Sequence, residues 1–107
     1  MAETDFGSRR QKIGGVTLDL TYYSGEDLYS DGDVEDEMLD IACGSAPEQF
    51  QEVIEERKSW PVFYHFSPLR SNIIGWLPFR KTDKVLEIGA GCGAITGALA
   101  EKAASVT

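Results

Sequence analysis

Apolar and polar side chains alternate over residues 16–22, where Val16, Leu18 and Leu20 are separated by polar residues. A period of two is typical of a half-buried strand. Gly14 and Gly15 stand directly before this segment and predict a hairpin with a strand over residues 10–13. The first twelve residues are otherwise mostly polar, and we expect residues 1–12 to form a mobile tail.

A helical period follows. Val34, Met38, Ile41 and Ala42 are spaced so that they share one face of a helix, with acidic residues on the other face. Gly44 predicts the end of this helix.

Two further helices are predicted before residue 80. Ser45 and Glu48 match a capping box for the second helix, which would turn Phe50, Val53 and Ile54 inward and end before Trp60 and Pro61. The third, over residues 67–78, begins with Ser67 as the N-cap and Pro68 at the first position, and it ends at Pro78. Its predicted inward face consists of Leu69, Ile73, Trp76 and Leu77.

The character of the chain changes after residue 83. Residues 84–88 form a short, mostly apolar run of the kind that a buried parallel strand requires. A glycine-rich loop follows over residues 89–93, then a predicted helix over 94–103 and the start of another strand over 105–107. The predicted organisation is therefore a tail (1–12), a hairpin with a helical cap (13–80) and a strand–loop–helix unit (81–107), which together make an α/β protein.

Charge is distributed unevenly, and its distribution bears on function. The chain of 107 residues has a formal charge of −8, and residues 1–40 carry 11 acids against 3 bases whereas residues 41–107 carry seven of each. This acidic face disfavours binding to nucleic acid, because like charges repel within the Debye length. The 42% of hydrophobic residues include no run near the ~20 needed to span a membrane, so no membrane contact is expected. Two cysteines without a CxxC pair, and no apolar leader, predict a cytoplasmic protein with free thiols.

The order of strand, glycine loop and helix predicts a nucleotide-type site. Glycines at 89, 91 and 93 permit positive φ angles and remove the Cβ atoms that would keep a ligand from the backbone. A helix that follows such a loop presents free N–H groups to the ligand. The arrangement is more specific than the glycines alone.

The residues of this loop resemble a known motif. The stretch VLEIGAGCG at residues 85–93 resembles the first motif, E/D-x-G-x-G-x-G, of class I S-adenosylmethionine-dependent methyltransferases. The continuation AITGALA resembles the first helix of that family, particularly in members related to adenine dimethyltransferases. The specific match covers residues 84–107, and the upstream helix at 67–78 is similar in a less specific way to the helix that precedes the first strand in such enzymes.

The resemblance implies a cofactor site and a fold. It implies that S-adenosyl-L-methionine binds at Glu87, Gly89, Ala90, Gly91 and Gly93, with the two leading glycines near the methionine part and Glu87 positioning the ammonium group, through water. The implied fold is the first strand, loop and helix of a truncated Rossmann-like sheet. Tyr64, His65 and Arg70 precede this unit and are candidates for the edge of the pocket. The resemblance assigns no methyl acceptor and no catalytic residue.

Two alternatives stay open. Gly89, Gly91 and Ala94 also satisfy G-x-G-x-x-G/A, the fingerprint of nicotinamide- and flavin-binding Rossmann folds. The acid at 87 and the glycine at 93 favour the methyltransferase motif over that fingerprint. In the other alternative, the chain is an acidic helical interaction or cap module without a cofactor, with an ordinary sharp turn at the loop.

Three other features favour structural roles. Residues 31–36 resemble a calcium loop, but Asp36 and Ala42 stand where an EF-hand needs Gly and Glu, so a solvated helix start is predicted and no metal site. His65 has no acid–base partner nearby in sequence and is expected to be packed or half-exposed. Cys92 is interpreted as a small loop residue.

The predicted sheet is incomplete within these residues. The acid that binds the ribose in the family falls about 20 residues beyond the glycines, which is past Thr107. We therefore expect the 107-residue chain to be the front portion of a methyltransferase, inactive by itself, and to self-associate through residues 84–107.

Overall fold

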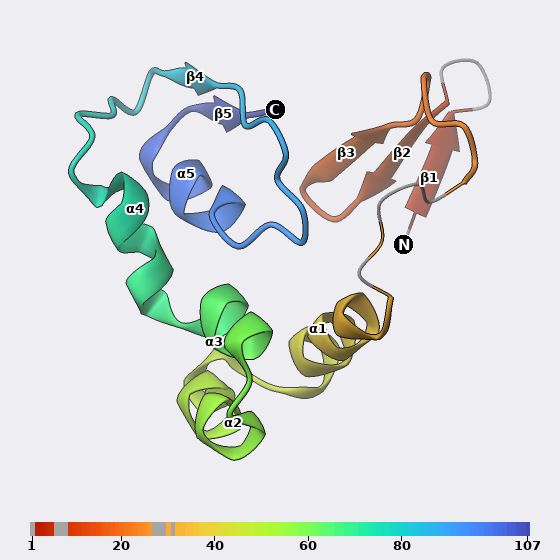
Figure 1. Cartoon of the computed structure of the whole chain (residues 1–107). Helices are drawn as coiled ribbons and strands as arrows, with labels where there is room; N and C mark the ends of the chain where they lie inside the picture. Colours follow the sequence, from red (N-terminus) through yellow and green to blue (C-terminus); the bar gives the residue numbers. More distant parts are fainter. Residues whose placement is uncertain (1, 6–8, 27–29, 31) are drawn as a thin grey trace. The chain divides into compact units, whose positions relative to one another are not determined.

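The computed structural model describes residues 2–5, 9–26, 30 and 32–107. The chain divides into two compact units, Met1–Ser30 and Asp31–Thr107. Both helices and small strands are present, so the structure is broadly α/β (Figure 1).

The first unit is a three-stranded antiparallel sheet in the order β1 (Ala2–Asp5), β2 (Arg10–Ile13) and β3 (Val16–Asp19). Ile13 pairs with Val16, so Gly14 and Gly15 form a two-residue turn, as predicted. Gly14 has a φ of 58°, which a side chain would disfavour and which a hairpin turn requires. Strand β2 confirms the hairpin partner predicted over residues 10–13, whereas β1 lies within the segment for which the sequence predicted a mobile tail.

The burial predicted for this sheet is not observed. Val16 is 59% exposed and Ile13 51% exposed, so the alternation at 16–22 marks a strand but not a half-buried one. Over residues 9–26, where the burial of this unit's side chains is described, no side chain is buried.

The second unit begins with three α-helices: α1 (Asp33–Gly44), α2 (Phe50–Arg57) and α3 (Trp60–Phe66), with a 3-10 turn, Pro47–Gln49, before α2. Their core is formed by Met38, Ile41 and Val62, against which Val34, Phe50, Val53, Ile54 and Phe66 pack. The predicted inward faces of the first two helices thus meet in one core, as expected.

Helix α3 was not predicted, because Trp60 and Pro61 were interpreted as an interruption. Pro61 stands in the first turn, where a missing N–H costs nothing, and the Ser59 hydroxyl accepts a hydrogen bond from the Val62 N–H at 3.5 Å. Helix α2 ends at Arg57, and the next residue, Lys58, has a left-handed φ of 51°. The Ser45–Glu48 capping box is also wrong: the Gln49 side chain accepts from the Ala46 N–H at 2.9 Å instead.

The third predicted helix is shorter than expected. It consists of a 3-10 turn, Pro68–Ser71, and a single turn of helix, α4 (Asn72–Gly75). Ser67 caps it as predicted, accepting from the Leu69 N–H at 3.3 Å. The predicted inward face is wrong, since Ile73 is 55% and Trp76 77% exposed while Ile74 is 8% exposed.

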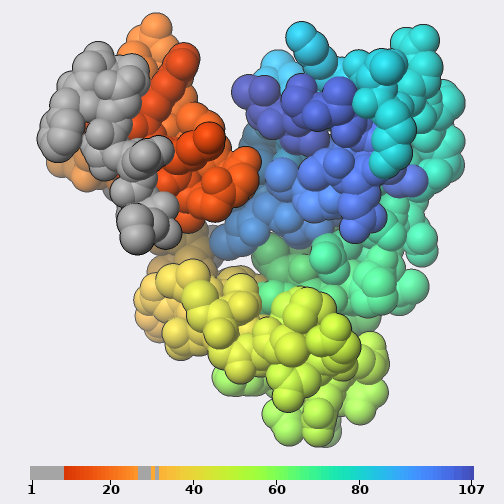
Figure 2. Space-filling view, turned by 180° about the vertical axis from the view of Figure 1, so that it is seen from behind, coloured from red at the N-terminus to blue at the C-terminus, as the bar shows by residue number. Residues whose placement is uncertain are grey.

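The unit closes with β4 (Lys84–Val85), a loop, α5 (Thr96–Lys102) and β5 (Ser105–Val106). The two strands are parallel, with Lys84 opposite Ser105 and Val85 opposite Val106. The Glu87 N–H extends the pairing by donating to the Thr107 carbonyl at 2.8 Å. Seen from behind, the atoms of α1 and α2 lie at one end of this unit and those of α5 and β5 at the other (Figure 2).

Candidate functional site

The glycine loop between β4 and α5 has the backbone that its sequence predicts. Gly89, Gly91 and Gly93 have φ angles of 75°, 57° and 79°, a region that side chains disfavour. The Gly93 N–H donates to the Ala90 carbonyl at 3.0 Å and closes a turn inside the loop. Each of the three glycines is therefore required by the local conformation.

The space beside the loop is open at its first two glycines. A Cβ atom added to Gly89 or Gly91 would meet no atom within 4 Å, whereas one at Gly93 would lie 3.5 Å from the Thr96 hydroxyl. Packing inside this unit therefore does not explain why the first two positions lack side chains. Their exposed backbone is accessible to a ligand.

Glu87 lies two residues before Gly89, at the N-terminal end of the same loop. Its carboxylate accepts a hydrogen bond from the Thr96 hydroxyl, at the first residue of α5, and the side chain is half-buried. The hydrogen bond fixes the acid beside the loop, nine residues along the chain from its donor. Thr96 was not predicted as a site residue. The sequence feature that could have indicated it is a hydroxyl side chain three residues after Gly93, the last glycine of the loop.

The exposure of the two apolar residues on either side of Glu87 differs from the expectation. Leu86 is 69% exposed and Ile88 89% exposed, although the sequence predicted a strand buried on both faces. Val85 and Glu87 point to the other face and are half-buried. One face of β4 and its extension is covered, and the other is bare in the described residues.

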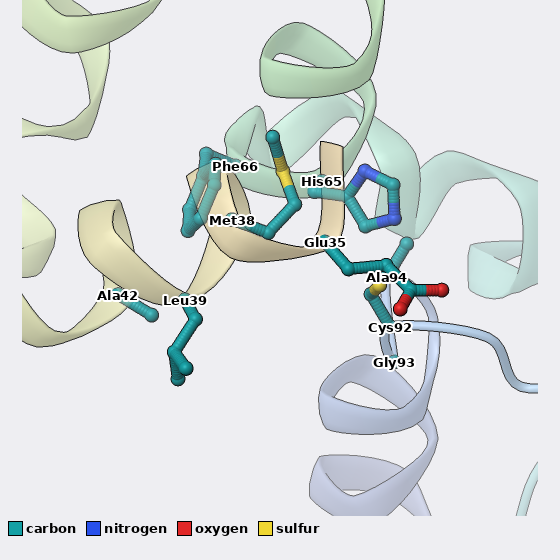
Figure 3. Close-up of a pocket in the computed structure, with 9 residues that line it drawn as sticks. All are labelled: Glu35, Met38, Leu39, Ala42, His65, Phe66, Cys92, Gly93 and Ala94. Carbon is teal, nitrogen blue, oxygen red and sulfur yellow. The ribbon is translucent and has the colours of Figure 1, made fainter. Parts of the chain in front are cut away.

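A hollow of about 290 Å³ adjoins the end of the glycine loop. Its lining comes from three segments: Glu35, Met38, Leu39 and Ala42 of α1, His65 and Phe66 of α3, and Cys92, Gly93 and Ala94 of the loop (Figure 3). The loop thus borders two spaces, the open side of its first glycines and this hollow.

Of the three residues predicted at the pocket edge, the structure brings only His65 to this hollow. The Tyr64 ring stacks on Trp60, with ring centres 6.0 Å apart, and contacts the His65 ring edge-on. Arg70 donates to the Ser67 carbonyl at 2.5 Å and lines a different hollow, beside Pro47 and Phe50.

The α1 residues of the hollow were missed by the sequence analysis. Glu35, Met38 and Ala42 stand at i, i+3 and i+7 and so share a helix face, which the sequence does contain. These α1 residues line the same hollow as residues 92–94, about 50 residues further along the chain, and the sequence holds no local signal for such an arrangement.

Two kinds of site are not found in the described residues. No group of three or more His, Cys, Asp or Glu side chains gathers there in a way that would hold a metal ion. No helix in those same ranges has the length and apolar composition needed to cross a bilayer.

Comparison with protein-family models, with curated proteins and with solved structures gave no match for this chain.

Proposed function

We propose that this chain provides the glycine-loop half of an S-adenosylmethionine site in a methyltransferase with a Rossmann-like sheet. The observation that carries the proposal is the loop itself: between β4, a strand of a parallel pair, and α5 lie three glycines with left-handed φ angles, with open space beside the first two. A loop of this kind lets a ligand approach the backbone closely.

The residues fit the cofactor in their chemistry. The Glu87 carboxylate is held beside the loop by Thr96, and it is an acceptor suited to the ammonium group of a bound amino acid. Gly89, Ala90 and Gly91 offer backbone with little steric hindrance. Bound S-adenosylmethionine would supply a sulfonium methyl group, while the chain supplies binding and orientation.

The same features favour this cofactor over a nicotinamide or flavin dinucleotide. The dinucleotide fingerprint is satisfied by Gly89, Gly91 and Ala94 and makes no demand on residue 93. Here Gly93 has a φ of 79° and is required by the turn. The acid two residues before the first glycine is likewise part of the methyltransferase motif and has no role in the dinucleotide one.

A titration followed by ¹H–¹⁵N NMR tests the proposal. We expect S-adenosylmethionine at millimolar concentration to shift the amide signals of Gly89, Gly91 and Gly93 in the wild-type chain. The Gly91→Val variant should lose these shifts, since a β-branched residue resists a φ of 57° and fills the open space.

Gly75→Val is the matched control, because Gly75 is also open within 4 Å but has no positive φ. It should respond to S-adenosylmethionine as the wild type does. Larger loop shifts with NADH than with S-adenosylmethionine would support the dinucleotide alternative and overturn the proposal. Absence of loop shifts with either molecule would support a module without a cofactor.

A further inference from the structure

A second hollow, of about 480 Å³, adjoins the start of α2 and the end of α3. Its size falls in the range of roughly 300–1,000 Å³ that small-molecule sites occupy. No residue of the glycine loop lines it, so it is a separate space from the proposed cofactor site. Its lining consists of Pro47, Glu48, Phe50 and Gln51 before and in α2, and of Phe66, Pro68 and Arg70 at and after the end of α3.

The apolar wall of this second hollow is held in place by the helical core. The Phe50 and Phe66 rings contact each other with their centres 4.8 Å apart, and both side chains pack against the core of α1 and α3. Both residues are half-buried, so part of each ring stays accessible. Pro47 and Pro68 are exposed and add two further apolar rings to the lining. Such a wall favours an aromatic or aliphatic group, because contact with it removes apolar surface from water on both partners.

Arg70 is the one cation among the lining residues, and its guanidinium group is anchored by a carbonyl group. Its Nη1 donates to the Ser67 carbonyl oxygen at 2.5 Å, and the Arg70 N–H donates to the same oxygen at 3.4 Å. Ser67 is 4% exposed, so this anchor lies in a packed part of the unit. A guanidinium group that is already held in place loses less conformational freedom when a ligand binds to it.

The other edge of the Arg70 guanidinium group has no partner among the residues that the structure describes. Within those ranges, Nε and Nη2 make no hydrogen bond and no ion pair. Their N–H groups leave one edge of the planar group in parallel, and this spacing matches the two oxygens of a carboxylate. Because Arg70 is half-buried, water screens an ion pair at this edge less than one at a fully exposed side chain. These two donors are therefore available to an acidic group of a ligand.

The remainder of the lining selects among acidic groups. Glu48 is the one acid of the lining, so its charge and that of Arg70 cancel. A phosphate group carries more than one negative charge near neutral pH and is costly to bring out of water against apolar walls, whereas a carboxylate carries a single charge. The apolar walls and the single guanidinium group accordingly favour a carboxylate.

We propose that this second hollow binds a small ionised carboxylic acid with an aromatic or aliphatic body. The carboxylate binds to Nε and Nη2 of Arg70, and the body lies against the rings of Phe50 and Phe66. This ligand site is additional to the glycine loop, and its occupation does not depend on the cofactor proposed there.

The test uses 3-phenylpropionate as the probe, with 3-phenylpropanamide as its neutral counterpart and 3-phenylpropylamine as a cationic one. Binding to the whole chain is followed by ¹H–¹⁵N NMR at the backbone amides of Phe50 and Phe66 and at the Arg70 Nε–H. We expect the acid to bind about fivefold tighter than the amide, because its hydrogen bonds are charge-assisted, and the amine to bind weakest. Only the acid should shift the Arg70 Nε–H signal, and inorganic phosphate at equal concentration should not displace it.

Two variants and one control locate the site. Arg70→Gln should reduce the preference for the acid over the amide to within about twofold. Arg80→Gln is the control, because Arg80 is an exposed arginine outside the hollow, and it should leave the preference unchanged. Gln51→Glu adds a second carboxylate to the lining at an exposed helical position, and it should weaken binding of the acid by about twofold without affecting the amide.

Three results would overturn the proposal: equal affinity for the acid and the amide in the wild type, a preference for the acid that survives Arg70→Gln, or displacement of the acid by phosphate. The backbone amide spectrum checks that Arg70→Gln folds, since this change removes the hydrogen bond to Ser67. If it does not fold, Gln51→Glu decides, because an unchanged affinity for the acid would overturn the proposal and a selective loss would support it. Titration with S-adenosylmethionine tests the proposed function separately, since Gly89 and Gly91 do not line this hollow.

Discussion

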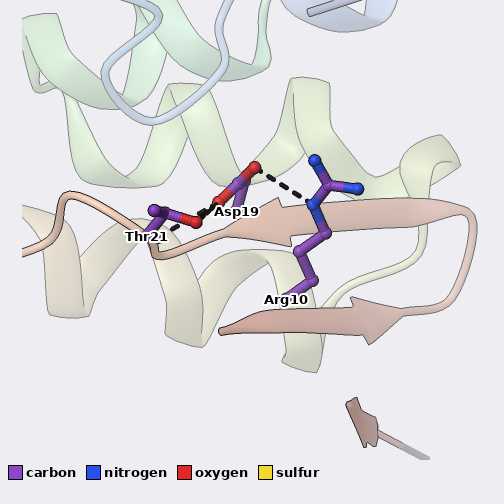
Figure 4. A network of polar contacts seen from close by, with 3 residues as sticks. All are labelled: Arg10, Asp19 and Thr21. Carbon is purple, nitrogen blue, oxygen red and sulfur yellow. Dashed lines mark hydrogen bonds and ion pairs between the residues drawn. The ribbon is translucent and has the colours of Figure 1, made fainter. Parts of the chain in front are cut away.

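At the scale of single residues, the clearest electrostatic effect is at Asp19, the last residue of β3. Its carboxylate accepts hydrogen bonds from the Thr21 hydroxyl at 2.5 Å, from the Thr21 N–H at 3.1 Å and from Arg10 at 3.1 Å (Figure 4). The Thr21 hydroxyl and backbone, followed by Arg10, lower the pKa of the Asp19 carboxyl from its ordinary value. All three donors favour the charged form.

The first prediction concerns this titration. Because the pKa is lower in the folded sheet than in the unfolded chain, the charged carboxylate favours folding above the ordinary Asp range, and this contribution is lost as the pH falls through the lowered pKa. Thr21→Ala should raise the Asp19 midpoint toward the ordinary value, as measured by ¹³C NMR. Arg10→Gln should raise it less, since the exposed ion pair is screened by solvent.

Thr17→Ala is the control for the first prediction, because Thr17 lies on the same strand but does not bond the carboxylate. It should leave the midpoint where it is. An Asp19 midpoint that Thr21→Ala does not move would mean that the turn geometry at residues 19–21 is wrong.

At the scale of elements, α4 differs most from its predicted packing. The sequence pattern from 67 to 78 indicated one long helix with Ile73 inward, but the segment changes from a 3-10 turn to a single α-turn. A 3-10 turn advances by three residues per turn, and the register of the inward face therefore shifts. Ile74, at 8% exposed, takes the buried position, and Ile73 does not.

The second prediction compares these two neighbours, which share side-chain chemistry. Ile74→Ala should cost about 2–5 kcal/mol of unfolding free energy, because it leaves a cavity in a packed site. Ile73→Ala should cost less than about 1 kcal/mol, since its side chain is 55% exposed. Urea unfolding of both variants checks this, and an equal loss in both would refute the register of α4.

At the scale of the whole molecule, one apolar face of the parallel pair of β4 and β5 is exposed in the part of the second unit that the structure describes. Leu86 and Ile88 are 69% and 89% exposed, on the side of the strand opposite to Val85 and Glu87. Strands of parallel sheets are normally covered on both faces. Exposed apolar side chains beside a short two-stranded edge are a site for association with another copy or with further chain.

The third prediction is that the chain self-associates through residues 84–107. Light scattering should show an average mass that rises with protein concentration, and Leu86→Asp should suppress the rise by placing a charge on the bare face. Leu69→Asp is the matched control, because Leu69 is 59% exposed on the segment before α4 and should leave association unchanged. A wild-type chain that stays monomeric at every concentration would contradict the prediction.

The local features of the chain followed from sequence because they depend on neighbouring residues. The hairpin at Gly14, the apolar faces of α1 and α2, and the positive φ angles of the glycine loop are all consequences of short-range geometry and periodicity. Helix α3 was not predicted because Pro61 was interpreted as a residue that interrupts a helix, whereas the first turn of a helix tolerates proline.

What the sequence by itself determined is the hairpin of β2 and β3, the helices α1 and α2, the strand–loop–helix order at residues 84–102 and the need for glycine at 89, 91 and 93. Only the tertiary structure decided which apolar residues are buried, and that α1 and α3 meet the end of the loop around one hollow. The reason is physical: backbone conformation and hydrogen-bonded turns are set over a few residues. Burial and a pocket, in contrast, depend on which distant surfaces pack together, and a local pattern permits several such packings.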